Sequence, residues 1–193
     1  MNTVIVKRKE FEIIAPLGER SYKVKRKDKT FFYKDFANDR EGFDRFARDV
    51  HRFSNTAIDK PKIYLVDKKA YKVVMQYIEG TFMLDMLIEG DLDEKFYEMI
   101  FETDWYGRNE RMQLDLRPDQ FKYDGKKMYY LPFRYRDFDG KDTFSTYYIK
   151  LWFYTDELVK YLKDYNLPYD EKRVGNVFQK NKEMALMAVK YYK

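Results

Sequence analysis

The chain has 193 residues, of which 45% are hydrophobic, 19% aromatic and 37% charged, with a formal net charge of +5. This hydrophobic content can build a core for one domain or two small lobes, which excludes a disordered tail. The absence of cysteine excludes disulfides, thiolate nucleophiles and cysteine zinc sites, and the single histidine, His51, excludes a multi-histidine metal centre within one chain. Phosphoryl transfer stays open, because it relies on carboxylates, a lysine and magnesium.

The first third of the sequence is typical of β-strands, because short runs rich in β-branched and aromatic residues alternate with polar turns. The predicted strands are Thr3–Val6, Phe11–Leu17, Tyr22–Arg26, Thr30–Phe36, Lys62–Val66 and Tyr71–Tyr77. A helix is predicted over Asp39–Phe53, where apolar residues recur at spacings of three and four. We expect His51, on this helix, to be an exposed residue without a functional role.

At Gly80 the sequence changes to a helical pattern. The predicted helices are Thr81–Ile88, Leu92–Asn109, Tyr154–Tyr165 and Val174–Tyr192. Between them, residues 112–121 are irregular, and Asp124-Gly125 turns the chain into a hairpin strand at residues 128–131. The sequence therefore predicts an α+β protein with a β-rich N-terminal lobe over residues 1–78 and a mostly helical C-terminal lobe over residues 79–193.

The most specific segment spans residues 113–120 and reads Gln-Leu-Asp-Leu-Arg-Pro-Asp-Gln. It resembles the catalytic loop of eukaryotic-like protein kinases, whose pattern is His-Arg-Asp-Leu-Lys-Pro-Glu-Asn. Three positions match outright and three carry related residues: Asp115, Leu116 and Pro118, then Arg117, Asp119 and Gln120. The resemblance implies a two-lobed protein-kinase-like fold with a reduced C-terminal lobe, binding ATP and magnesium between the lobes.

The resemblance also assigns roles to the loop. Asp115 would orient or deprotonate the acceptor hydroxyl, and Arg117 would stabilise the transferring phosphoryl group. Gln120 would offer an amide oxygen to magnesium, although its side chain is one methylene longer than the asparagine of the family. The C-terminal lobe leaves little room for a peptide-binding platform, and small-molecule kinases of related fold share the two-lobe plan, so a small acceptor stays open.

The nucleotide-binding candidates lie in the N-terminal lobe. Lys34, on a predicted strand, resembles the phosphate-binding lysine of the family. Its acidic partner is expected on the following helix, where Glu41 is the only glutamate and Asp44 and Asp49 are alternatives. The remaining candidates for nucleotide binding are Gly18, Met75 and Tyr77.

Two positions depart from the family pattern. The glycine-rich loop should lie at residues 17–22, where Gly18 is the only glycine and Glu19 is placed to repel phosphate. The metal-binding aspartate of the Asp-Phe-Gly motif should fall where Pro132 stands, and Asp137 or Asp139 would replace it if the hairpin is longer. These departures suggest an alternative, a pseudokinase that serves as a binding or regulatory module without catalysis.

The net positive charge suggests a second alternative, a basic nucleic-acid-binding domain, with lysine and arginine concentrated at residues 7–9 and 23–27. No window approaches the roughly 18 apolar residues that a membrane span requires, and residues 1–7 lack the pattern of a secretion signal. We therefore expect a cytoplasmic protein whose partners are a nucleotide and an unidentified acceptor or protein, with no membrane partner.

Overall fold

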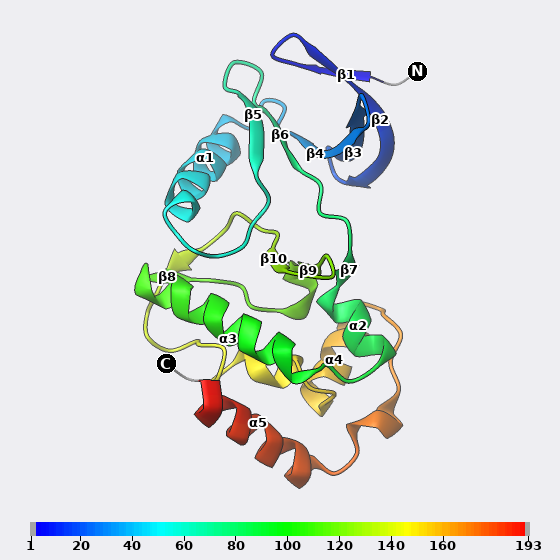
Figure 1. The fold of residues 1–193 in the computed structure, drawn as a ribbon, viewed down its shortest axis with the longest axis vertical. Helices are drawn as coiled ribbons and strands as arrows, with labels where there is room; N and C mark the ends of the chain where they lie inside the picture. The colour runs from blue at the N-terminus through cyan, green and yellow to red at the C-terminus, as the bar shows by residue number, and fades with distance from the viewer. Residues whose placement is uncertain (1–2, 192–193) are drawn as a thin grey trace. The chain divides into compact units, whose positions relative to one another are not determined.

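The structure is a computed structural model that describes residues 3–191 (Figure 1). It confirms the α+β class, and its backbone divides into two compact units. Unit 1 runs to Ser54 and resumes over Lys60–Glu79, whereas unit 2 takes Asn55–Asp59 and the chain from Gly80 onward. The short segment 55–59 therefore leaves the first unit and packs with the second.

Unit 1 contains a six-stranded antiparallel sheet with the strand order β1-β2-β3-β4-β6-β5. Its strands are β1 (Thr3–Val6), β2 (Lys9–Gly18), β3 (Ser21–Arg26), β4 (Lys29–Asp35), β5 (Ile63–Asp67) and β6 (Lys72–Gln76). Two register shifts in the pairing of β2 with β3 mark bulges, which bend a strand and increase its twist. Figure 1 shows the resulting curl of the sheet at these strands.

Helix α1 (Arg40–Ser54) is inserted between β4 and β5. Because the chain returns through β5 at the sheet edge, β6 and not β5 pairs with β4, and Lys34 has Val73 as its partner. A buried apolar cluster stabilises this sheet: Val6, Phe11, Val24, Tyr33 and Val74. The six predicted strands and the predicted helix of this part of the chain are confirmed.

Unit 2 is mostly helical. Its helices are α2 (Met83–Glu89), α3 (Glu94–Asn109), α4 (Asp156–Asp164) and α5 (Val177–Tyr191). Its strands are short: β7 (Thr81–Phe82), β8 (Met112–Gln113), β9 (Phe121–Tyr123), β10 (Met128–Tyr130) and β11 (Arg136–Asp137). Three 3₁₀ turns complete it, at Pro118–Gln120, Tyr148–Leu151 and Glu171–Val174. Strands β10, β9 and β7 form one small sheet, and β11 pairs with β8.

The four predicted helices are confirmed, with two corrections at their ends. Thr81 and Phe82 do not start a helix, because they pair with β9 instead. The last helix begins at Val177 and not at Val174, because the preceding 3₁₀ turn ends at Gly175, whose φ of +63° breaks the helix. The predicted end at Tyr192 lies outside the described residues.

Two packing features shape unit 2. Gly107 on α3 has no side chain, and a Cβ there would lie 3.0 Å from the Leu114 side chain, so glycine allows the loop around Leu114 to approach the helix closely. The second feature is a buried apolar cluster that joins α2 to α4: Leu84, Leu87, Tyr154, Leu158, Val159, Leu162 and Val174. Across residues 3–191, no helix has the length and apolar character needed to cross a membrane.

Candidate functional site

The loop at residues 113–117 runs extended from β8 into the 3₁₀ turn. Leu114 and Leu116 are buried, whereas Asp115 and Arg117 are only partly buried, because successive side chains of an extended backbone point to opposite sides. Pro118 occupies the start of the turn and keeps Arg117 in an extended conformation, with ψ of 146°. The alternation in the sequence therefore directs the two charged side chains to the same side of the loop.

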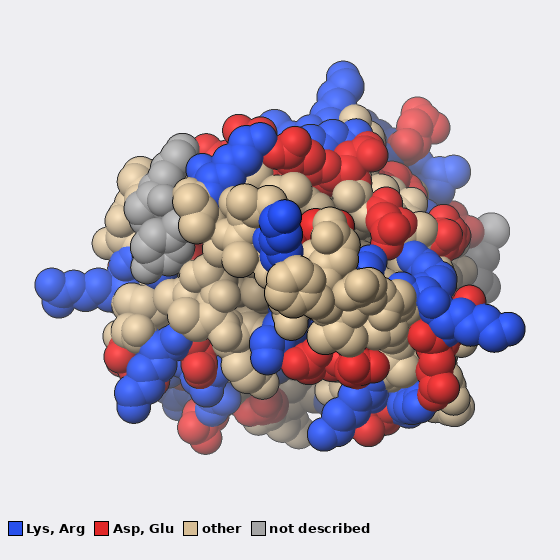
Figure 2. Space-filling model, turned by 90° about the horizontal axis from the view of Figure 1, so that it is seen from below, with Lys and Arg blue, Asp and Glu red and all other residues tan. Residues whose placement is uncertain are grey.

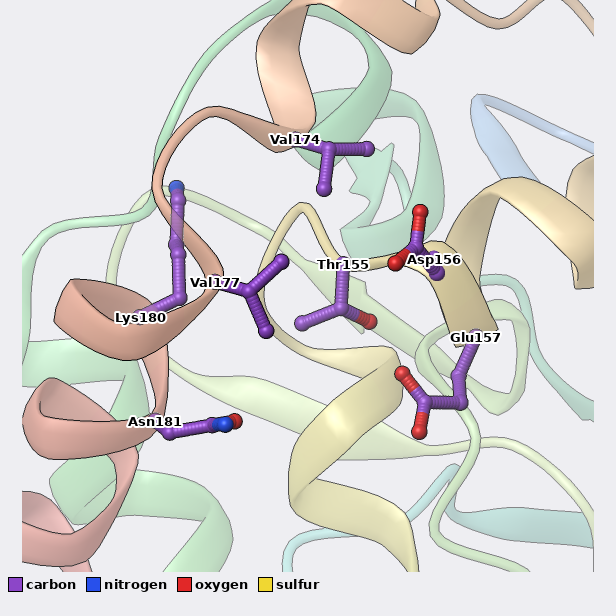
Figure 3. Close-up of a pocket in the computed structure, with 7 residues that line it drawn as sticks. All are labelled: Thr155, Asp156, Glu157, Val174, Val177, Lys180 and Asn181. Atoms are coloured by element: carbon purple, nitrogen blue, oxygen red, sulfur yellow. The ribbon is translucent and has the colours of Figure 1, made fainter.

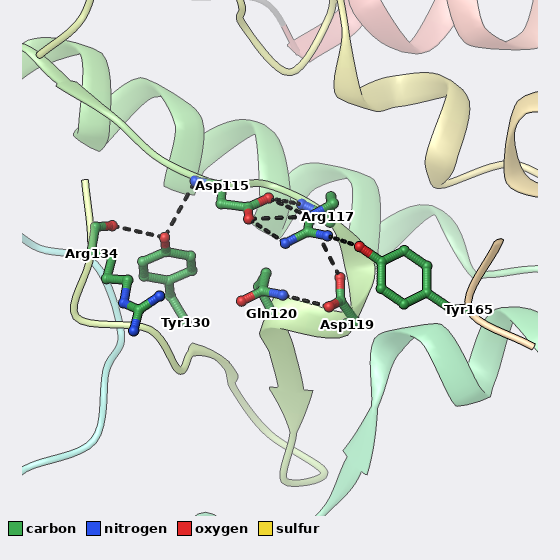
Figure 4. Close-up of polar contacts among 7 residues, drawn as sticks. All are labelled: Asp115, Arg117, Asp119, Gln120, Tyr130, Arg134 and Tyr165. Atoms are coloured by element: carbon green, nitrogen blue, oxygen red, sulfur yellow. Dashed lines mark hydrogen bonds and ion pairs between the residues drawn. The ribbon is translucent and has the colours of Figure 1, made fainter. Parts of the chain in front are cut away.

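Asp115 and Arg117 form a bidentate ion pair (Figure 4). The Arg117 Nε donates to Asp115 Oδ1 at 2.8 Å, and Nη2 donates to Oδ2 at 2.6 Å. The remaining Nη1 donates to the hydroxyl of Tyr165 at 3.2 Å. The hydrogen bonds to Asp115 raise the pKa of Arg117 above its already high ordinary value, so the guanidinium stays charged.

Asp115 and Arg117 both stay partly exposed in this ion pair. The Asp115 side chain keeps 38% of its surface exposed, and that of Arg117 keeps 29%. Each carboxylate oxygen of Asp115 accepts two hydrogen bonds from Arg117: Oδ1 from the backbone N–H and from Nε, and Oδ2 from Nε and from Nη2. The pair therefore presents a carboxylate and a cation together, at a defined place on unit 2.

Two buried aromatic side chains hold the loop backbone. The Asp115 N–H donates to the Tyr130 hydroxyl at 3.3 Å, and that hydroxyl donates to the carbonyl of Arg134 at 3.0 Å. On the next residue, the indole N–H of Trp152 donates to the carbonyl of Leu116 at 2.7 Å. No local sequence pattern indicates the two contacts with the loop, because their partners are 15 and 36 positions apart along the chain.

Asp119 and Gln120 lie side by side on the 3₁₀ turn, and the Gln120 amide donates to the Asp119 carboxylate. The other oxygen of Asp119, Oδ1, lies 4.0 Å from Arg117 Nε. Burial, and then the nearby charge of Asp119, raise the pKa of Tyr161 above its ordinary value. The turn thus brings an amide and a carboxylate, both with oxygen atoms of the kind that magnesium prefers, next to the Asp115 pair.

The other metal candidates lie after the hairpin. Asp137 is exposed on β11, where its Cα partner is Met112, and Asp139 is exposed and accepts a hydrogen bond from the N–H of Lys141 at 2.9 Å. Pro132 lies in the link between β10 and β11. Within residues 3–191, no group of three or more Asp, Glu or His side chains is placed to hold a metal ion. The metal roles of Gln120, Asp137 and Asp139 stay predictions.

The structure does not bring Lys34 and Glu41 together. The Lys34 Nζ donates to the backbone carbonyl of Glu19 at 2.8 Å. Glu41 lies in the first turn of α1, where 87% of its side chain is exposed and Arg45, one turn later, is its ion-pair partner at 3.5 Å. Of the two alternatives, Asp44 pairs with Arg40 across the same helix, and Asp49 is buried on it.

The remaining nucleotide candidates are in different environments. Gly18 is exposed at the end of β2 with φ of +148°. Met75 is buried in the sheet, opposite Phe32. The ring of Tyr77 lies under the Lys23 ammonium, whose Nζ is 4.3 Å from the ring centre. The same ammonium binds Glu79 at 2.9 Å, an ion pair that the sequence did not predict.

A small hollow lies elsewhere in unit 2, between the starts of α4 and α5 (Figure 3). Thr155, Glu157 and Lys180 are among its lining residues, and its volume is about 30 Å³. Ligand pockets usually have volumes of about 300–1,000 Å³, so this hollow has room for roughly one water molecule and not for a nucleotide.

No family model matches this chain, and no curated protein matches it. The resemblance to kinases therefore rests on the residues of the loop alone.

Proposed function

We propose that the protein is a minimal kinase-like phosphotransferase that uses ATP with magnesium. The observation that carries the proposal is the ion pair of Asp115 with Arg117 on a clamped, partly exposed loop. Phosphoryl transfer requires a carboxylate beside the incoming hydroxyl and positive charge beside the transferring group. The loop provides both groups from residues two positions apart.

In the proposed step, an acceptor hydroxyl attacks the γ-phosphorus of ATP while Asp115 accepts its proton. The new bond joins the acceptor oxygen to phosphorus, the bond to the β-phosphate oxygen breaks, and ADP leaves with that electron pair. Arg117 stabilises the charge on the transferring oxygens. Magnesium would neutralise further phosphate charge, and Gln120 and Asp119, on the 3₁₀ turn that follows Arg117, would offer it oxygen ligands.

The order of elements along the chain supports a two-lobed kinase-like fold. A lysine-bearing strand, β4, is followed by helix α1, by β6 running towards Glu79-Gly80, and by the long helix α3. The loop with Asp115 and the β9–β10 hairpin come next. This is the order that the family pattern implies for residues 11–133.

A thermal-shift titration tests whether the protein binds nucleotide. We expect millimolar ATP with magnesium to raise the melting temperature of the wild type, because a ligand that binds the folded state stabilises it. Lys34→Ala should lose this rise, whereas Lys25→Ala, which removes an exposed lysine from the neighbouring strand β3, should keep it. A wild type that shows no rise at millimolar ATP would contradict the proposed nucleotide site.

A second candidate is a pseudokinase, a binding module without catalysis. Two observations favour it: Pro132 stands where the family has a metal-binding aspartate, and Glu41 pairs with Arg45 instead of Lys34. This candidate predicts that ATP with magnesium does not raise the melting temperature.

The nucleic-acid alternative would require a continuous basic surface. Figure 2 shows a face of the molecule on which Lys and Arg side chains intermingle with Asp and Glu. A nucleic-acid surface needs a stripe of one sign to follow the phosphates. An affinity for oligonucleotides that falls steeply with salt would revive this alternative.

A further inference from the structure

We propose that Tyr130 is a positioning residue that couples the backbone of Asp115 to the segment after the β9–β10 hairpin. The proposal rests on the proposed function, because it assigns Tyr130 a part in the same site. The Tyr130 hydroxyl makes both contacts of this link, one with Asp115 and one with Arg134 (Figure 4).

The ring of Tyr130 is held firmly. Tyr130 ends β10, and only 1% of its surface is exposed. Its backbone N–H donates to the carbonyl of Asp59 at 2.9 Å, and its ring packs against Phe121 with centroids 5.2 Å apart. A buried, packed ring fixes the position of its hydroxyl.

The Tyr130 hydroxyl acts as both a hydrogen-bond donor and a hydrogen-bond acceptor. It donates its single proton to the Arg134 carbonyl and accepts the backbone N–H of Asp115. Burial raises the pKa of Tyr130 above its ordinary value, so the hydroxyl keeps the proton that it donates. The two hydrogen bonds therefore form a continuous link from the loop to the segment after the hairpin.

This link joins two parts of the proposed site. On one side it holds the residue whose carboxylate acts as the base. On the other it holds the segment 131–134, which contains Pro132 at the position of the family's metal-binding aspartate. A shift of this segment would move the Asp115 backbone, so the tyrosine keeps Asp115 at a fixed position relative to the segment 131–134.

Tyr154 provides a matched control for the loss of a hydroxyl. It is also 1% exposed and lies in the same unit, and its hydroxyl also accepts a backbone N–H, that of Asp170 at 2.7 Å. Its hydroxyl bonds to Asp170, just before the 3₁₀ turn at 171–174, and not to the Asp115 loop. Tyr130→Phe and Tyr154→Phe therefore remove the same kind of hydrogen bond at two places.

The first test is amide hydrogen exchange measured by NMR without nucleotide. Tyr130→Phe should speed exchange at the Asp115 amide by about twofold to tenfold, the range expected for one ordinary hydrogen bond, and leave Asp170 unchanged. Tyr154→Phe should do the reverse. Unchanged exchange at Asp115 in Tyr130→Phe would overturn the link, whether or not the protein transfers phosphate.

The second test separates positioning from general stability. With ATP turnover as the readout, Tyr130→Phe should lower kcat and leave KM for ATP near the wild-type value, and Tyr154→Phe should change neither. Equal loss of kcat in both variants would show a structural effect only. If the wild type turns over no ATP, the proposed function fails and the catalytic part of this inference fails with it, while the exchange result still decides whether the link exists.

Discussion

Gly18 and Gly80 have nearly the same φ angle in different surroundings. Their φ angles are +148° and +143°, values that residues with a Cβ rarely adopt. A Cβ on Gly18 would meet nothing within 4 Å, whereas one on Gly80 would lie 2.1 Å from the carbonyl oxygen of Tyr123. The two positions therefore separate backbone strain from steric overlap.

We predict that Gly18→Ala lowers the free energy of unfolding by about 1–3 kcal/mol, the usual range for backbone strain. Gly80→Ala should lower it by clearly more, because the Tyr123 backbone must also move. Urea denaturation of the two variants measures the difference. Equal destabilisation would show that the close contact at Gly80 relaxes at no cost.

Glu41 lies on the exposed face of helix α1. Because its side chain is almost fully exposed and pairs only with Arg45, Glu41→Gln should change the free energy of unfolding by less than about 0.5 kcal/mol. The same variant should leave any ATP-induced rise in melting temperature unchanged. A rise that disappears in Glu41→Gln would show that nucleotide draws Glu41 to Lys34.

Helix α4 depends on the residue before its first turn. Thr155 is buried, its hydroxyl accepts the N–H of Leu158 at 3.3 Å, and it donates to the carbonyl of Lys150 at 2.7 Å. Thr155→Ala should lower the free energy of unfolding by about 1–2 kcal/mol, the upper range for loss of a helix cap. Thr155→Ser keeps the hydroxyl and should retain most of the stability in the same denaturation experiment.

The elements that periodicity defines could be predicted from the sequence. The helices α1 and α3 and the strands of unit 1 follow from local patterns of apolar residues. The short strands β7, β8 and β11 could not be predicted, because each has two residues and exists only through a partner elsewhere in the chain. Pairing of this kind is a tertiary contact and leaves no local pattern.

In the candidate site, too, only local contacts could be predicted from the sequence. Asp115 and Arg117 could be placed together because alternation along an extended loop is local. Tyr130 and Trp152 could not be connected to the loop, since their contacts join residues 15 and 36 positions apart. The expected ion pair of Lys34 with Glu41 would join strand β4 to helix α1. Which acid of the helix faces the lysine depends on how the helix is rotated against the sheet, and no local sequence pattern indicates this rotation.

Asp104 should make the free energy of unfolding of the whole chain depend on pH. It is buried on α3, with Arg108 as its ion-pair partner at 3.0 Å. Burial raises the pKa of Asp104 above its ordinary value, although Arg108 acts in the opposite direction. The folded protein therefore binds this proton more strongly than the unfolded chain does.

The sign of the effect follows from proton linkage. The stabilisation that the bound proton of Asp104 adds to the free energy of unfolding is fully present below the pKa of an unfolded aspartate, about 3.9. It is lost as the pH rises through the folded-state pKa. The stability of the wild type relative to Asp104→Asn should therefore fall as the pH rises through this window and then level off. Urea denaturation at a series of pH values measures it, and a relative stability that grows with pH would show that Arg108 outweighs burial.

The role of Asp115 as the base is tested most directly by the release of phosphate from ATP with magnesium, with water as the acceptor, in the wild type and in Asp115→Asn. We predict turnover by the wild type and a loss of about a hundredfold or more in the variant, the scale of a lost general base. Because the ion pair is partly exposed, the melting temperature should change little. Glu157→Gln, which removes an exposed acid paired with Lys150, is the control and should keep full turnover. An unchanged rate in Asp115→Asn would contradict the proposed mechanism.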